Sequence, residues 1–128
     1  MKVSIACLIY KSIPYLKFIQ RAIEENTPEL KNGDAEFFFV VNYKRGISDE
    51  VMDYLDNNDI PHHAFMDYPE QLDYPKNLDV IYKAWNLAVD IAQGEYVVLL
   101  NSDMFPHSRN WLNRLLFWME GIGKDLTH

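Results

Sequence analysis

The amino-acid sequence predicts an α/β fold in which a doubly wound, mostly parallel sheet carries helices on both faces. One observation is that four apolar runs alternate with segments whose apolar residues recur at helical spacing, in the order βαβαβαβα. A second is that the apolar runs are continuous, which is typical of parallel strands covered on both faces. Together they predict a sheet buried between two layers of helices.

The first strand and helix occupy the beginning of the chain. Residues 3–10, VSIACLIY, form an apolar run that predicts a buried strand. From Ser12 the apolar residues change to helical spacing. Ser12 can cap this helix and Pro14 suits its first turn, while Thr27-Pro28 stops it.

A second strand and helix follow a polar connector. Residues 36–41, EFFFVV, form a continuous aromatic and aliphatic run that predicts a strand. Gly46 then breaks the chain and Ser48 offers a helix cap. Asp49 and Glu50 suit the positive end of the helix that begins there.

Two further units complete the pattern. Residues 60–67 form a weaker strand candidate, and a strongly amphipathic helix over residues 77–94 has Gly94 at its end as a stop. The run EYVVLL, residues 95–100, predicts the fourth strand and precedes a last helix. The tryptophans fall at helical spacing and are expected in the core: Trp85, Trp111 and Trp118.

The composition fits a single domain over residues 1–128 and narrows its partners. With 128 residues and 48% hydrophobic content, the chain can bury one core. A formal charge of −7 and a pI near 4.9 argue against nucleic acid or an anionic membrane as a partner, because both require a basic surface. Cys7 is the only cysteine, which excludes an internal disulfide. The first apolar run is too short to span a bilayer and no cleavage site follows it, so we expect a cytoplasmic protein.

A Rossmann-like sheet of this kind predicts where a ligand binds. If the strand order is 3-2-1-4, the loops after Tyr10, Val41 and Leu100 line one crevice at the carboxyl ends of the strands. The first turn, IYKSIP, has no glycine to bring backbone amides close to a phosphate, and the chain has no P-loop. An acidic ligand would then need a cation bridge, for which Asp103 stands at a suitable strand end. The alternative is that Asn101-Ser102-Asp103 is an ordinary turn.

Three stretches carry a resemblance to a known family. They are VSIACLIYKSIPYLKFIQRAI, FFFVVNYKRGISDEVMDYL and KAWNLAVDIAQGEYVVLLNSDMFPHSRNWLNRLL. In this order they resemble the opening strand and helix, the second strand with its acidic turn, and the Gly-Glu-Tyr strand with its Asp-x-Asp corner, of the family 2 glycosyltransferases. The resemblance implies a GT-A-like fold over almost the whole chain.

The chain departs from the family pattern at several of these positions. Asn42-Tyr43 replaces the usual aspartate of the second turn, and Trp85 replaces an arginine. Asn101 stands where the corner usually has its first acid. The resemblance implies a divalent metal, Mn²⁺ or Mg²⁺, held by Asp103. It also implies these contacts to a UDP-, GDP- or dTDP-sugar: Tyr10, Asn42, Tyr43, Asn86, Asn101, Ser102 and Asp103.

The function that the resemblance implies is transfer of a sugar to an acceptor hydroxyl. In the family, the catalytic base and the acceptor site come from sequence beyond the last helix seen here, so we expect this chain to be the nucleotide-sugar half of a catalytic domain. Glu120 and Asp125 are the only acidic residues after Asp103, and neither is expected to act as the base. The alternative is a binding or interaction module that keeps the fold without turnover.

Two other groups of residues are expected to have no ligand. His62 and His63 are adjacent on a strand, so they point to opposite faces and cannot serve one metal ion together. We expect a surface or structural role for both. Lys44 and Arg45 are expected to be solvated in a loop, although these cations could also bind a phosphate.

Overall fold

A computed structural model describes residues 1–65, 76–101, 106 and 108–126 of the chain. Its centre is a parallel sheet with the strand order β3-β2-β1-β4. This order confirms the predicted arrangement, in which the first and fourth strands are neighbours at the point where the strand order reverses. The strands are β1 (Val3–Ile9), β2 (Ala35–Asn42), β3 (His62–Phe65) and β4 (Tyr96–Leu100).

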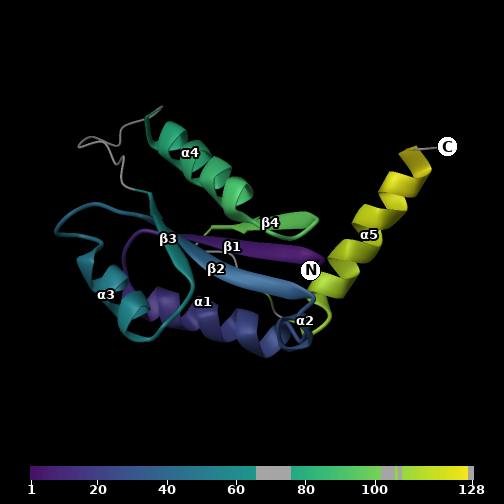
Figure 1. Cartoon of the computed structure of the whole chain (residues 1–128), viewed down its shortest axis with the longest axis horizontal. Helices are drawn as coiled ribbons and strands as arrows, with labels where there is room; N and C mark the ends of the chain where they lie inside the picture. Colours follow the sequence, from purple (N-terminus) through teal and green to yellow (C-terminus); the bar gives the residue numbers. More distant parts are fainter. Residues whose placement is uncertain (66–75, 102–105, 107, 127–128) are drawn as a thin grey trace.

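Helices cover both faces of the sheet, as the sequence predicts. Figure 1 shows α4 on one face and α1, α2 and α3 on the other. The sequence did not predict α2, which occupies part of the connector between α1 and β2. The helices are α1 (Ile13–Asn26), α2 (Glu29–Asn32), α3 (Asp49–Asn57), α4 (Lys76–Ile91) and α5 (Trp111–Leu126).

The two faces of β1 belong to two separate cores. Ile5 and Cys7 pack in a cluster with residues of α1 and α3, whereas Ala6 and Leu8 pack in a cluster with α4. Every residue of β1 is buried, which explains why its sequence reads as a continuous apolar run. Burial raises the pKa of the Cys7 thiol to about 12, so Cys7 is a structural residue rather than a nucleophile.

Ser12 caps α1 as the sequence predicts. Its side-chain oxygen accepts from the backbone N–H of Tyr15 at 3.5 Å, and Pro14 lies in the first turn of the helix. Ser12 has a φ of 84°, in the left-handed region, and this turns the chain sharply from β1 into the helix. The conformation brings the start of α1 back over the sheet.

Gly94 has a different role from the predicted helix stop. The helix α4 ends at Ile91, and a Cβ at Gly94 would lie 2.6 Å from the backbone carbon of Val3. Glycine is therefore needed because the turn into β4 passes against the backbone of β1. The Gly94 N–H donates to Ser4 Oγ at 2.8 Å, and Ser4 Oγ in turn donates to the carboxylate of Glu36.

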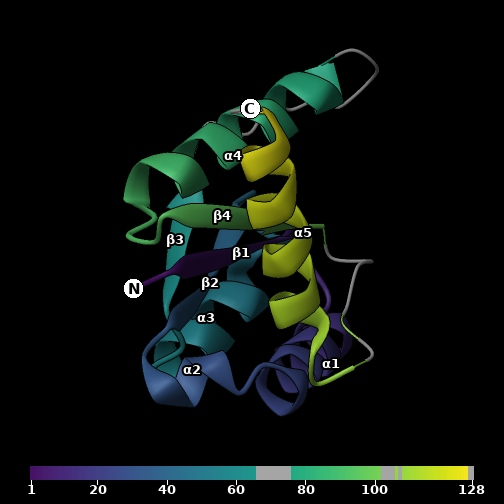
Figure 2. The same ribbon diagram turned by 90° about the vertical axis from the view of Figure 1, so that its right-hand side faces the viewer.

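The helix α5 crosses the amino edge of the sheet, which is where the parallel strands begin (Figure 2). Its first turn is anchored: Trp111 Nε1 donates to Thr27 Oγ1 at 2.9 Å, and Leu112 is buried in the α1 and α3 cluster. Further along, Glu120 pairs with Lys2 at 2.6 Å. Trp118 is 67% exposed, so the prediction that it lies in the core is wrong: helical spacing puts it on a side of α5 that the core does not cover, next to Phe117, which is 75% exposed. Within the described ranges, no helix combines the length and apolar character needed to cross a membrane.

Candidate functional site

Three predicted site residues follow strands at the carboxyl edge of the sheet, which is where the parallel strands end. The strand register gives their positions relative to one another. Ile9 pairs with Val41, so Tyr10 follows β1 beside Asn42, the last residue of β2. Leu100 pairs with Cys7, so Asn101 follows β4 level with Leu8. Asn101 thus lies two residues, or roughly 7 Å, further back along the strands than Tyr10.

Asn42 has an unpaired acceptor at this edge. The residue is 9% exposed, and its Oδ1 has no hydrogen-bond partner. Two other buried side-chain atoms of described residues share this property, Glu29 Oε2 on α2 and Trp85 Nε1 on α4. Asn42 alone of the three lies at a strand end on the carboxyl edge. Buried polar groups are normally paired, so an orphan at such an edge marks a position to examine for ligand binding.

Ser48 joins the turns that follow β1 and β2. It is fully buried, and its hydroxyl donates to the carbonyl of Tyr10 at 2.8 Å while accepting from the Lys44 N–H at 3.1 Å. The carbonyl of Asn42 lies 3.3 Å from the same hydroxyl. Ser48 occupies the N-cap position of α3, as the sequence predicts, but its hydroxyl makes no cap hydrogen bond to the helix. Nothing in the local sequence indicates the bond to Tyr10, which spans 38 positions.

Tyr43 is held in place by Asp49. Its hydroxyl donates to one carboxylate oxygen of Asp49, and the Gly46 N–H donates to the other at 2.8 Å. The hydrogen bond from Tyr43 lowers the pKa of Asp49, with a smaller contribution from Gly46. The same bond raises the pKa of Tyr43. The backbone N–H of Tyr43 donates to the Phe65 carbonyl at 3.0 Å, which fixes this turn to the end of β3.

The predicted metal ligand Asp103 and its neighbour Ser102 lie outside the described residues. Asn101, the described member of the corner, is half-buried after β4. In the part of the chain that the structure describes, no three His, Cys, Asp or Glu side chains form a group that could hold a metal ion. Among the predicted contacts at this edge, the described residues Tyr10, Asn42, Tyr43 and Asn101 carry no carboxylate, and the Asp49 carboxylate nearby is bound to Tyr43 and Gly46, so a metal here would depend on Asp103 for its charge.

Asn86 is the predicted site residue that the structure does not bring to this edge. It is exposed in the half of α4 nearer Ile91, and no hydrogen bond or ion pair between described residues joins it to Tyr10, Asn42 or Asn101. Its neighbour Trp85 is half-buried and packs against the cluster that contains Ala84 and Ala88. The contact predicted between Asn86 and a nucleotide sugar stays a prediction.

The adjacent histidines of β3 point to opposite faces of the sheet, as predicted. His62 Nε2 lies 2.7 Å from a carboxylate oxygen of Asp56 in α3, and its Nδ1 lies 2.6 Å from the Ile60 carbonyl. The ring of His63 packs edge-on against Phe38, in the cluster that faces α4. The two imidazoles therefore cannot bind one ion together.

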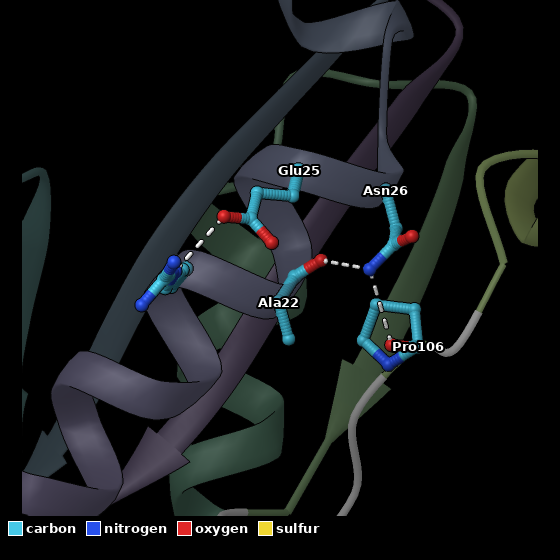
Figure 3. Close-up of polar contacts among 5 residues, drawn as sticks. Ala22, Glu25, Asn26 and Pro106 are labelled. Atoms are coloured by element: carbon cyan, nitrogen blue, oxygen red, sulfur yellow. Dashed lines mark hydrogen bonds and ion pairs between the residues drawn. The ribbon is translucent and has the colours of Figure 1, made fainter.

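An open depression of roughly 610 Å³ lies at the C-terminal end of α1, away from the carboxyl edge. Asn26 lines it, and Figure 3 shows the Asn26 amide pointing to the carbonyls of Ala22 and Pro106, to which it donates at 2.8 Å and 3.4 Å. This amide is satisfied within the protein and ties α1 to the segment that precedes α5. The depression is lined by Glu24, Glu25, Asn26, Pro28, Lys31 and Arg109.

Comparisons with known proteins find likeness at the level of structure. No protein-family model and no curated protein sequence matches the chain. A crystal structure of S. aureus TarS, residues 1–349, superposes with a TM-score of 0.64 at 16% identity and covers 94% of this chain. TarS is a GT-A glycosyltransferase. The chain has a GT-A fold.

Two further structures of TarS residues 1–349 match to a similar degree. The complex with UDP has a TM-score of 0.64 and the complex with UDP-GlcNAc one of 0.62, each at 16% identity and over 94% of this chain. The matched region is 33% of the chain in the first structure and 32% in each complex, so the chain spans about a third of the length of TarS 1–349. The fold predicted from the resemblance to family 2 glycosyltransferases is therefore confirmed.

Proposed function

We propose that the chain is the nucleotide-sugar-binding part of a glycosyltransferase. The observation that carries this proposal is the GT-A fold, whose β1 and β4 meet at the carboxyl edge where the predicted site residues lie. TarS, which shares the fold, has been crystallised with UDP and with UDP-GlcNAc. A UDP-sugar is the first candidate ligand for this chain.

The nucleobase is proposed to bind between the turns after β1 and β2. Tyr10 and Asn42 are adjacent there, and Tyr43 follows on the strand end that is fixed to β3. An amide side chain both donates and accepts, so Asn42 can pair with the edge of a base. Its Oδ1 has no partner among the described residues, which supports this role because a ligand N–H would satisfy it after a small rotation of the side chain.

The diphosphate is proposed to bind at the corner after β4. Asp103 would supply the carboxylate ligand of a Mn²⁺ or Mg²⁺ ion, with Asn101 and Ser102 beside it. Such an ion, when bound, neutralises charge on the diphosphate leaving group. The strand register puts Asn101 level with Leu8 of β1, two residues behind Tyr10, so the diphosphate would lie behind the base.

The proposed reaction is attack of an acceptor hydroxyl on the anomeric carbon of the sugar. The bond from that carbon to the diphosphate breaks, and the nucleoside diphosphate leaves while a base takes the hydroxyl proton. Glu120 does not suit this role, because it is paired with Lys2 at the amino edge. The chain spans about a third of TarS 1–349, so transfer is proposed for the protein as a whole. The engagement of Glu120 favours, as a second candidate, a module that binds nucleotide sugars without turnover.

Calorimetric titration tests the proposal. We expect UDP-GlcNAc, UDP, GDP or dTDP to bind in the presence of Mn²⁺, and we expect Asp103→Ala to weaken that binding about tenfold or more. Asp90→Ala, which removes an exposed carboxylate from α4, is the matched control and should leave affinity unchanged. Asn101→Asp should strengthen metal-dependent binding. Equal affinity of the Asp103→Ala variant and the parent chain would contradict the metal role, and no binding of any nucleotide would contradict the function.

A further inference from the structure

Ser48 lies at the start of α3, but its side chain makes no capping hydrogen bond to that helix. A serine at this position usually accepts from a backbone N–H one turn into the helix. Here only the Ser48 backbone carbonyl does so, accepting from the Met52 N–H at 3.0 Å. The hydroxyl is left for contacts on the side of the sheet.

Those contacts join two loops that are distant in sequence. The hydroxyl donates to the Tyr10 carbonyl at 2.8 Å, with the Asn42 carbonyl at 3.3 Å as a second acceptor, and it accepts from the Lys44 N–H at 3.1 Å. Tyr10 and Asn42 are the residues proposed to contact the base. One fully buried oxygen therefore bonds to the backbone of both turns.

We propose that Ser48 is a positioning residue that sets the spacing of Tyr10 and Asn42 and thereby the nucleobase selectivity of the site. This inference rests on the proposed function. Ser48 does not touch the ligand in this account, and it acts through the two carbonyls. A hydrogen bond shielded from water is stronger than an exposed one, so the spacing it fixes resists the distortion that a poorly fitting base would require.

The test compares nucleobase selectivity in the parent chain and in Ser48→Ala. Each protein is titrated by calorimetry with UDP, GDP, CDP and ADP in the presence of Mn²⁺. The ratio of the strongest to the weakest affinity measures selectivity. We expect the parent chain to discriminate, and we expect the ratio to fall about tenfold in Ser48→Ala. A loss of stability alone would lower the folded fraction and would not change this ratio.

Ser12→Ala is the matched control. It removes a serine hydroxyl from the β1–α1 turn that carries Tyr10, but among the described residues that hydroxyl bonds only to the Tyr15 N–H within α1, at 3.5 Å. We expect this variant to keep the selectivity of the parent. Ser48→Cys fills the same space with a much weaker hydrogen-bonding group, so it should lose selectivity too and can replace Ser48→Ala if that variant fails to fold.

The outcomes separate this inference from the proposed function. A parent chain that binds nucleotides, with unchanged selectivity in Ser48→Ala or Ser48→Cys, overturns the role of Ser48 and leaves the function standing. An equal fall in Ser12→Ala also overturns it, because general loosening of the turn would then suffice. Equal affinity of the parent for all four nucleotides overturns it as well. Absence of any nucleotide binding overturns both proposals.

Discussion

Ser4 at the amino edge of the sheet and Asn42 at its carboxyl edge differ in whether their buried side-chain oxygens are hydrogen-bonded. At the amino edge, Ser4 and the carboxylate of Glu36 accept the N–H groups of Gly94 and Gln93, each at 2.8 Å. At the carboxyl edge, Asn42 Oδ1 is buried without a partner. Satisfied groups stabilise the turn into β4, whereas an unsatisfied one costs stability and remains available to a ligand. The comparison supports a structural role for Ser4 and the proposed ligand-binding role for Asn42.

The ion pairs follow the same division. Lys2 pairs with Glu120 at 2.6 Å and with Glu95 at 3.6 Å, so it joins α5 and the start of β4 to the amino edge. These pairs are partly exposed and contribute little to stability by themselves. They raise the pKa of Lys2, chiefly through the hydrogen bond with Glu120. The carboxylate of Asp49 at the other edge serves Tyr43 and the Gly46 turn instead.

The largest expected effect comes from adding a side chain at Gly94, where the turn into β4 passes close to the backbone of β1. Gly94→Ala would place a Cβ 2.6 Å from the Val3 carbon and 2.7 Å from the Ser4 nitrogen, so the turn must move away from β1. We expect the free energy of unfolding to fall by about 3 kcal/mol, measured by urea denaturation.

Gly121→Ala is the control for this substitution. A Cβ at Gly121 meets no atom within 4 Å, and the residue lies inside α5. Alanine there should raise the stability by about 0.5–1 kcal/mol, because it favours the helix. If both variants changed stability by the same amount, the close approach at Gly94 would not be the reason for its glycine.

A smaller effect of opposite sign is expected from replacing Asn42, whose unpaired Oδ1 lies at the carboxyl edge. Asn42→Leu removes a buried acceptor that has no partner and fills a similar volume, so it should raise the free energy of unfolding by about 1 kcal/mol. The same variant should bind nucleotides more weakly in calorimetry. Stability and affinity would then change in opposite directions.

Ser4→Ala is the matched substitution at the amino edge. It leaves the Gly94 N–H and the carboxylate of Glu36 without the hydroxyl that joins them. We expect a loss of about 1–2 kcal/mol in stability and unchanged nucleotide affinity. Destabilisation by Asn42→Leu, equal to that by Ser4→Ala, would show that the two edges do not differ in this way.

The smallest expected effect concerns the Tyr43 hydrogen bond to Asp49. The pKa of Asp49 is lowered from its ordinary value of 3.8, so the bond contributes stability above that pH and loses it as the pH falls through the lowered pKa. Tyr43→Phe should raise the Asp49 pKa toward 3.8, although the Gly46 N–H remains bound to the carboxylate. Carboxyl-carbon NMR titration measures the change. An unchanged Asp49 pKa would mean that the two side chains do not bond in solution.

Much of the fold could be predicted because apolar periodicity reports burial. The continuous runs of β1 and β2 indicated strands covered on both faces, and both strands proved buried almost throughout. The short helix α2 could not be predicted, because four residues are too few to show helical spacing. Trp118 was misplaced since periodicity identifies one side of a helix but not whether another element covers it.

The position of the candidate site could be predicted from the sequence, but the contacts that support it could not. Residue types at strand ends located Tyr10, Asn42 and Asn101, because parallel strands bring their carboxyl ends to one edge. The roles of Ser48 and Gly94 depend on atoms of β1 and its turn, far away in sequence. Local patterns assigned both residues to helix termini, which is where serine and glycine most often act.

Chemical-shift mapping with UDP-GlcNAc and Mn²⁺ tests most directly the claim that the carboxyl edge is the functional one. Backbone amide signals would be followed during the titration. We expect the signals of Tyr10, Asn42 and Asn101 to move together while those of Ser4 and Gly94 stay in place. Shifts that gather at the amino edge, or around the depression at the end of α1, would contradict it.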